Sequence, residues 1–450
     1  MAEQEERGPA GADDAAATAG RSRGLCRRRL VAGAGIAGAL GIAGFGGGVA
    51  GRALAEREAA GRDPGTLAYP FRGETQQGIT TPAQDNMYTA AFDVSTDDVA
   101  ELKALLTEWT TAAEQMCAGE LIGGEPSANK QAPPRDTGEA WGYPPAGLSL
   151  TFGFGATLFA DAGGADRFGL RDRMPGVLAE GVPKFANERL QAGSGDGDLL
   201  VQACSNDPQV CVHAIRNLTR IAFGTARLRW GQIGYGRTSS TSASQETPRN
   251  LFGFKDGTAN VKAEEAEALE EHVRVQADDD AAAGWLTGGS YFVARKIRMH
   301  LEVWDRVRLA QQEEVIGRDK RYGAPLSVAD PAPEDEFDAV DYDAAGEGGR
   351  PAVPADSHVA VVSPEQNDGH RLLRRGYNYT DGNDSLGRLD AGLFFIAYVR
   401  DPRAGFYPIL QRMTQHDALT EYLQHEASAL FAVPPGLREG DTMVGQRLFE

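Results

Sequence analysis

Hydrophobic positions in residues 85–245 follow two spacings in turn, and each spacing predicts one type of element. Short apolar or alternating runs predict strands near residues 88–94, 147–154, 199–203 and 228–232. Apolar residues three and four apart predict helices over about residues 96–118 and from Asp207 onward. The resulting order, β-α-β-β-α-β, is that of a ferredoxin-like unit.

A similar plan returns in residues 246–450, which we predict to be a second ferredoxin-like half. The pattern predicts strands at 290–297 and 393–399, and helices at 301–316 and over most of 406–430. Between them, residues 323–356 form an acidic loop rich in Pro and Gly. Helices segregated on antiparallel sheets make the predicted fold class α+β.

The first 84 residues differ in character from the predicted fold. Residues 1–55 begin with a polar stretch that is typical of disorder, followed by Arg27-Arg28-Arg29, an uncharged Gly/Ala-rich run and Ala53-Leu54-Ala55. This order predicts a signal peptide, and the adjacent arginines indicate the twin-arginine export machinery. A membrane anchor is the alternative, because the run is long enough to span a bilayer. Residues 56–84 are predicted to be an N-terminal segment of the exported protein.

Composition narrows the classes of partner and of covalent chemistry. The formal charge of −19 argues against a nucleic-acid partner and favours cationic or neutral ones. Beyond the signal, Cys117, Cys204 and Cys211 are an odd number for a disulfide framework. Cys204 and Cys211 lie among apolar residues, and we predict that these two are buried thiols. The chain has no CxxCH motif for covalent haem attachment.

One short run carries the strongest indication of chemistry. Residues 250–260 read Asn-Leu-Phe-Gly-Phe-Lys-Asp-Gly-Thr-Ala-Asn, which places Asp256 on a turn flanked by Gly253 and Gly257. Glycines at these positions let the backbone bend and approach a flat ligand closely. A lone Asp-Gly pair is more often a simple surface turn.

The run from Phe252 to Thr258 resembles the signature of the dye-decolourising peroxidases, a family of haem enzymes. Other segments resemble the same family, in its order, between about residues 69 and 436. They include Thr151–Gly155, Asp207–Val210, Glu246–Asn250, Gly288–Tyr291, Arg298–His300, Asp356–Val359 and Arg374–Tyr377. The similarity is greatest to the exported bacterial subgroup that includes haem deferrochelatase/peroxidases. Thr75 departs from that subgroup, which commonly has a His there.

The resemblance implies a haem b (heme b), bound non-covalently in the C-terminal half. It implies that His358, which we expect at the start of a strand over 359–362, is the axial ligand of the haem iron. The other histidines have poorer settings for this role, namely His213, His272, His300, His370, His416 and His425. By the same resemblance, Gly257, Thr258 and Ala259 lie against the haem, and Phe394 forms part of its distal wall.

On the distal side, the resemblance assigns the peroxide proton to Asp256 and the stabilising positive charge to Arg374 rather than Arg375. An Asp is a base only when ionised, and a free Asp has a pKa of ~3.9, so this role predicts an acidic pH optimum. Arg318 and Lys320 are candidates for pairing with haem propionates, although a surface charge run explains them equally well. Trp230, Trp285, Trp304 and Tyr377 are candidates for electron relay, with core packing as the stronger expectation.

The leading hypothesis is an exported haem peroxidase that uses hydrogen peroxide to oxidise dyes, phenolics or other organic electron donors. Its expected location is extracellular, periplasmic or associated with the cell envelope, and its further partners are an iron-uptake or a copper protein. The alternatives are a haem deferrochelatase and a haem carrier without turnover. A chlorite dismutase is weaker, because the Gly253–Gly257 run does not belong to that family. The sequence does not indicate an oligomeric state.

Overall fold

The N-terminal half is built on four antiparallel strands in the order β4-β1-β3-β2. In this computed structural model the structure describes residues 64–124 and 129–450. The strands are β1 (Asn86–Val94), β2 (Ser149–Gly155), β3 (Leu199–Ser205) and β4 (Ala226–Arg237). With helices α2 (Val99–Cys117) and α5 (Pro208–Ile221) between them, they confirm the predicted β-α-β-β-α-β order.

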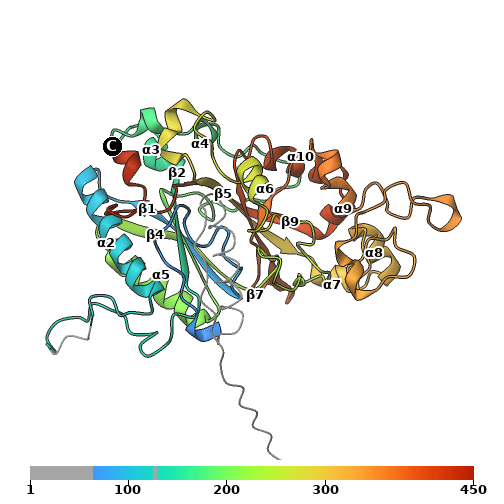
Figure 1. Cartoon of the computed structure of the whole chain (residues 1–450), viewed down its shortest axis with the longest axis horizontal. Helices are drawn as coiled ribbons and strands as arrows, with labels where there is room; N and C mark the ends of the chain where they lie inside the picture. The colour runs from blue at the N-terminus through green and yellow to red at the C-terminus, as the bar shows by residue number, and fades with distance from the viewer. Residues whose placement is uncertain (1–63, 125–128) are drawn as a thin grey trace, which may run out of the picture. The chain divides into compact units, whose positions relative to one another are not determined.

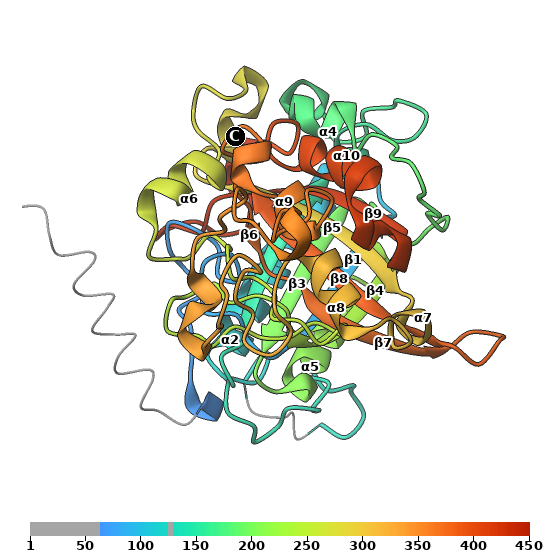
Figure 2. The same ribbon diagram turned by 90° about the vertical axis from the view of Figure 1, so that its right-hand side faces the viewer.

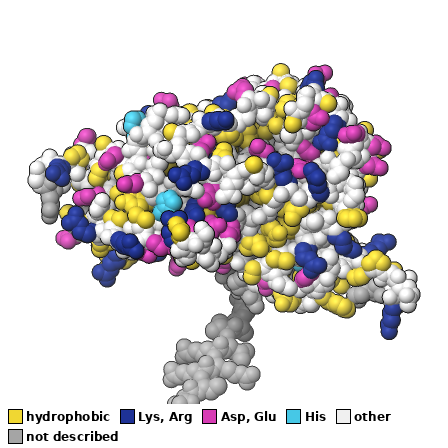
Figure 3. All heavy atoms as spheres, turned by 180° about the vertical axis from the view of Figure 1, so that it is seen from behind, with side chains coloured by type: hydrophobic (Ala, Val, Ile, Leu, Met, Phe, Trp, Pro, Cys, Tyr) yellow, Lys and Arg dark blue, Asp and Glu magenta, His cyan; other side chains and the backbone are white. Residues whose placement is uncertain are grey.

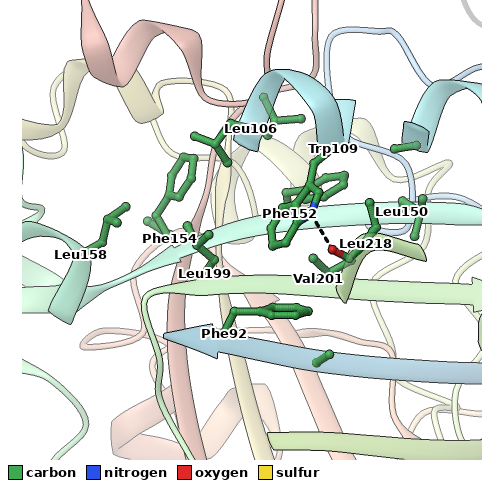
Figure 4. Packing of buried hydrophobic residues seen from close by; sticks show 14 of the residues in the cluster. Phe92, Leu106, Trp109, Leu150, Phe152, Phe154, Leu158, Leu199, Val201 and Leu218 are labelled. Carbon is green, nitrogen blue, oxygen red and sulfur yellow. Dashed lines mark hydrogen bonds between the residues drawn. The ribbon is translucent and has the colours of Figure 1, made fainter. Parts of the chain in front are cut away.

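The two helices begin where the sequence supplies a cap. The Asp98 carboxylate accepts from the N–H of Ala100 at the start of α2, and Asp207 accepts from Gln209 at the start of α5. The helices lie side by side on one face of the strands (Figure 1). Their buried faces form the core shown in Figure 4, where the indole Nε1 of Trp109 donates to the carbonyl of Leu218 at 2.8 Å. This bond joins α2 to α5 inside the core.

The C-terminal half repeats the strand order, as β9-β5-β8-β7. These strands are β5 (Ser290–Met299), β7 (Tyr377–Asn383), β8 (Leu389–Val399) and β9 (Leu423–Val433), and short β6 (Leu373–Arg374) also pairs with β8. The edges of the two sheets pair with each other, β2 with β9 and β4 with β7. Eight strands therefore close into a ring, and two ferredoxin-like halves share one barrel. Figure 2 shows the β7–β8 hairpin extending outward from it.

The remaining helices are short. They are α3 (Ala156–Phe159), α4 (Gly176–Glu180), α6 (Ala266–His272), α7 (Leu301–Trp304), α8 (Leu309–Ile316), α9 (His358–Val361) and α10 (Phe406–His416). Helix α9 contacts both α8 and α10, and the three helices gather over the C-terminal half (Figures 1 and 2). The acidic loop carries only the 3-10 turns η4 (Pro333–Phe337) and η5 (Glu347–Gly349).

Two predicted helices are corrected by the structure. The helix predicted over 301–316 is broken into α7 and α8, because the buried amide of Gln312 donates to the carbonyls of Trp304 and Val307 and ends the first one. The helix predicted over 406–430 ends at His416. Residues 423–433 instead form β9, whose apolar residues pair along the whole length of β5.

Two further corrections concern strands. Residues 359–362 were predicted to be a strand, but His358–Val361 form helix α9, with Ser357 as the N-cap residue. Strand β7 was not predicted, because Tyr377–Asn383 is polar and mostly exposed towards its end. Strand β7 is the second strand of the ferredoxin-like order in the C-terminal half, and the predicted order lacked it.

The predicted signal peptide, residues 1–55, lies outside the described residues. Within the part that the structure describes, no helix is both long and apolar enough to cross a membrane. Cys204 and Cys211 are buried free thiols, as predicted, and Cys117 is a further buried free thiol. Acidic and basic side chains are interspersed on the face shown in Figure 3.

Candidate active site

A cavity of about 460 Å³ lies entirely within the C-terminal half. Its floor is the outer face of three neighbouring strands, β8, β5 and β9, whose alternate side chains point into it. The floor residues are Leu393, Phe395, Arg295, Ile297, Met299, Leu423 and His425. Most of the lining is apolar, and α10 adds Phe406, Ile409, Leu410 and Met413. A largely apolar cavity of this size is typical of a site for a small organic molecule or a cofactor.

His358 projects into this cavity from the first turn of α9. Its Nδ1 lies 2.7 Å from Oδ2 of Asp417, which is fully buried. Burial alone would lower the pKa of the imidazole, but the Asp417 carboxylate outweighs it and raises the pKa above its ordinary value. With Nδ1 engaged, Nε2 is the nitrogen that remains for a ligand or a metal.

The sequence analysis missed Asp417, although this residue orients the histidine. Its Oδ1 accepts from the N–H of Leu419 and caps the 3-10 turn η7 (Ala418–Tyr422), while Oδ2 contacts His358. An N-cap Asp can be recognised from sequence, but a partner 59 residues away cannot. A histidine held by a carboxylate is the usual arrangement of a metal-ligating imidazole.

Asp256 and Arg374 meet at the same cavity. Arg374 donates from Nη1 to Oδ1 of Asp256 at 2.8 Å. Both side chains are mostly buried, with 26% of the Arg374 side chain and 15% of the Asp256 side chain exposed. The second carboxylate oxygen, Oδ2, accepts from Nδ2 of Asn250 at 3.2 Å. The carboxylate is therefore held by one charged and one neutral donor, and Asn250 is another residue that the sequence analysis did not single out.

The backbone of Arg374 is fixed by its neighbours. Its N–H donates to Oδ1 of Asn260 at 2.6 Å, and its carbonyl accepts from Asn260 Nδ2 and from the hydroxyl of Ser239, each at 2.9 Å. These bonds fix the two-residue strand from which the guanidinium of Arg374 projects. The charge of Arg374 also acts on a neighbour, because burial and this charge lower the pKa of Lys262 to about 8.

The structure also separates the two adjacent arginines. Arg375 is fully buried and does not line the cavity. Its guanidinium donates to the carbonyl of Thr81 and to the side chain of Gln84, both from the segment before β1. Of the two, Arg374 is the one that lines the cavity, and its distal role stays a prediction.

Gly257, Thr258 and Ala259 line the cavity, and Phe394 does not. Gly257 has a φ of +87°, and a Cβ there would lie 2.9 Å from Cα of Ser239, so only glycine fits. The prediction for Phe394 is wrong, because its ring faces the barrel interior and packs against Trp230, with centroids 6.2 Å apart. Phe395, one residue later, lines the cavity instead.

Of the two predicted propionate partners, only Arg318 lines the cavity. Its Nη1 donates to the carbonyls of Gly323 and Glu336, and its buried Nε has no hydrogen-bond partner in the described part of the chain. Lys320 donates to Gln312 outside the cavity. An unmet donor on a buried cation fits an anionic group of a ligand.

The other singled-out residues divide between core and cavity. Trp285, Trp304 and Tyr377 are buried in the core and Trp230 is partly exposed. Among the other histidines, His213 is buried against Asp136, whereas His370 and His425 line the cavity. His425 belongs to β9 and not to the predicted last helix. Thr75 does not line the cavity.

The residues present fit a haem. Across the described residues, no three His, Cys, Asp or Glu side chains gather as a metal site. A porphyrin would supply ligands for its own iron, and Nε2 of His358 would be a further ligand. The apolar walls suit the macrocycle, and the unmet Nε of Arg318 suits a propionate.

Comparisons with known proteins agree with this chemistry. Family models described as Dyp-type peroxidase, N-terminal, and Dyp-type peroxidase, C-terminal, match residues 76–236 and 247–438. A deferrochelatase of Escherichia coli (strain K12) is 35% identical, over 94% of this chain and 96% of that protein.

Solved structures give the same relationship. A DyP-type peroxidase from Streptomyces coelicolor is 38% identical, covers 86% of this chain and 98% of its own, and superposes with a TM-score of 0.77. The oxyferrous complex of DtpA from Streptomyces lividans has the same identity, coverage and TM-score.

Proposed function

Because the chain belongs to the Dyp-type peroxidase family and is therefore a haem-dependent peroxidase, we propose that its cavity binds haem b non-covalently through His358. One observation carries this assignment: of the three described histidines that line the cavity, His358 alone contacts a carboxylate. That contact holds Nδ1 and leaves Nε2 for the iron. All residues that line the cavity lie between 250 and 425, so the haem belongs to the C-terminal half, 246–450.

When bound, haem would supply the iron at which the O–O bond of hydrogen peroxide breaks. It would hold the oxidising equivalents that peroxide provides until an organic donor returns the electrons one at a time. The residues of the chain surround this chemistry. The walls of α10 and of the three floor strands exclude water from the macrocycle, which strengthens the fields of the charged groups around it.

Asp256 acts on the proton of the peroxide. In its ionised form the carboxylate takes the proton from the oxygen that will stay and gives it to the oxygen that leaves as water. The donors Arg374 and Asn250 fix the carboxylate and leave lone pairs on both oxygens free for this transfer. Arg374 keeps its charge throughout and stabilises the negative charge that develops on the leaving oxygen.

Dyes, phenolics and related organic molecules are the electron donors that we propose. The twin-arginine signal in residues 1–55 would export the folded, haem-loaded protein, placing it outside the cytoplasm with its donors. Because export would place the protein outside the cytoplasm, we also propose a partner protein there that acts in iron uptake or binds copper.

The absorption spectrum of the purified protein tests the peroxidase proposal. A Soret band that shifts on addition of one equivalent of hydrogen peroxide and returns on addition of a phenolic donor supports it. A haem-loaded protein whose spectrum does not change on addition of peroxide would indicate a carrier. A carrier does not require the Asp256–Arg374 pair.

Deferrochelatase activity is the second candidate, because relatives of that name match over 94% of the chain. In that activity iron leaves haem and the macrocycle stays intact. Anaerobic incubation of the loaded protein with dithionite as the reductant and a ferrous chelator separates the two activities. Protoporphyrin fluorescence that rises together with the chelator's colour supports iron release, and a stable Soret band contradicts it.

A further inference from the structure

Three buried side chains beneath the cavity have no part in the peroxidase chemistry described above. Arg295 of β5 is 1% exposed and pairs with Glu188, which lies in the loop between α4 and β3. Arg295 also contacts His425 of β9, and both line the cavity floor. Such a buried ion pair needs every hydrogen bond it can make, so its unmet groups are informative.

The first informative group is the imidazole of His425. Nε of Arg295 donates to Nδ1 of His425 at 3.2 Å, and because a guanidinium keeps its protons, Nδ1 must be the acceptor. Burial, reinforced by the charge of Arg295, lowers the pKa of His425 to about 3. The ring is therefore neutral at working pH and carries its single proton on Nε2, which becomes a donor.

The second is Arg295 itself. Its Nη2 is taken by Glu188 and its Nε by His425, but its buried Nη1 has no hydrogen-bond partner among the described residues. An unmet donor on a buried cation is costly unless a ligand completes it. Arg295 and His425 are thus neighbours in the lining of the cavity floor, and each has an N–H with no hydrogen-bond partner among the described residues.

We propose that Arg295 and His425 form a subsite that binds a carboxylate group. Two N–H donors on adjacent strands match the two oxygens of a carboxylate, and one donor is charged. Because Glu188 balances Arg295, recognition depends on these hydrogen bonds more than on net charge. The carboxylate belongs either to the haem, which is the source that rests on the proposed function, or to a separate aromatic acid.

The first arm of the test asks whether the haem supplies the carboxylate. Haem and haem dimethyl ester are titrated into the haem-free full-length chain and followed at the Soret band. If the haem supplies it, wild type prefers the free acid. His425→Leu reduces that preference by roughly 10- to 100-fold, the effect of one hydrogen bond to a charged group. His425→Gln, which keeps a donor and an acceptor, retains it.

The second arm asks whether a separate acid supplies the carboxylate. Benzoate and the neutral, similarly shaped benzamide are titrated by calorimetry into haem-loaded and haem-free protein. If a separate acid is the ligand, benzoate binds the loaded protein and His425→Leu weakens it by a similar factor. In either arm, Glu188→Gln should strengthen binding of the carboxylate, because it keeps the bond to Arg295 and removes the competing negative charge.

The outcomes are distinct. If His425→Leu changes neither the preference for free-acid haem nor the binding of benzoate, the subsite does not exist. If haem fails to bind wild type at all, the proposed function fails, and benzoate binding to the haem-free protein still decides the subsite.

Discussion

Nη1 of Arg374 lies 2.8 Å from Oδ1 of Asp256, so the two side chains proposed for the distal side are each other's ion-pair partners. The contact joins two lining residues of the cavity that are 118 residues apart in the sequence. Each residue therefore sets the electrostatic environment of the other, and a substitution of one also changes the second. Rates alone cannot divide the roles between them, but pH profiles can.

We expect Asp256→Asn to slow the reaction with peroxide by roughly 10²- to 10⁴-fold, the usual contribution of a positioned acid–base group. It should also flatten the acidic limb of the rate. Arg374→Leu should cost roughly 10²- to 10³-fold, the effect of one stabilising donor, and leave an acidic limb in place. Stopped-flow absorbance of the haem across pH ~3 to 8 measures both, a range that brackets a carboxylate. A wild-type rate and profile in Asp256→Asn would make Asp256 a structural turn residue.

We expect Asn250 to act only through Asp256. Asn250→Asp keeps the acceptor that holds the N–H of Phe252 but replaces the donor to Asp256 with a second negative charge. A like charge favours the protonated carboxylate, so the acidic limb should move to higher pH and the rate below it should fall about tenfold. In the Asp256→Asn background the same substitution should have little further effect on the peroxide reaction, and a full additional loss there would contradict this role.

We expect His358→Ala to lose the Soret band or to bind haem weakly. His370→Ala is the matched control, because His370 lines the same cavity and contacts no carboxylate in the described residues. Its spectrum should be that of wild type. The assignment of the iron ligand is wrong if His358→Ala retains an ordinary five-coordinate spectrum.

The sequence predicted the N-terminal half well, because its helices have clear caps and its strands follow one another in order. It singled out Asp256, His358 and Arg374, since each lies in a distinctive local motif, and all three line one cavity. It failed for Phe394, because strand β8 is apolar on both faces and its run of side chains does not reveal which face meets the cavity.

Long-range contacts account for most of the other failures. Residues 423–433 suit a helix or a strand, and only pairing with β5 decides for β9. The roles of Asp417 and Arg295 depend on partners 59 and 107 residues away, which no local sequence pattern reveals. Tertiary contacts of this kind override local preference.

We expect protein recovered from the culture medium or periplasm to begin near Glu56. This expectation rests on Ala53-Leu54-Ala55, whose small residues suit a cleavage site, and on the adjacent arginines, which favour the twin-arginine route. Intact-mass spectrometry measures the start, and replacement of both Arg27 and Arg28 by Lys should retain the protein in the cytoplasm. Recovery of the full-length chain in the membrane fraction would indicate an anchor.

Asp417 should make the stability of the haem-free protein depend on pH through His358. The carboxylate raises the pKa of this imidazole above its unfolded value of ~6.5. A raised pKa contributes stability that is fully present below pH ~6.5 and is lost as the pH rises through the folded-state pKa. Asp417→Asn removes the charge and keeps the cap on Leu419, so it isolates this contribution.

The difference in melting temperature between wild type and Asp417→Asn should therefore be larger at pH ~5.5 than at pH ~9, values on either side of an ordinary imidazole pKa. Calorimetry of the two haem-free proteins measures it. Loading with haem should shrink this pH dependence, because an iron on Nε2 excludes the proton that the carboxylate would otherwise stabilise. A difference in melting temperature that stays constant across this range would mean that Asp417 holds His358 in place without influencing its protonation. The pH dependence of haem affinity would then have to arise from another group.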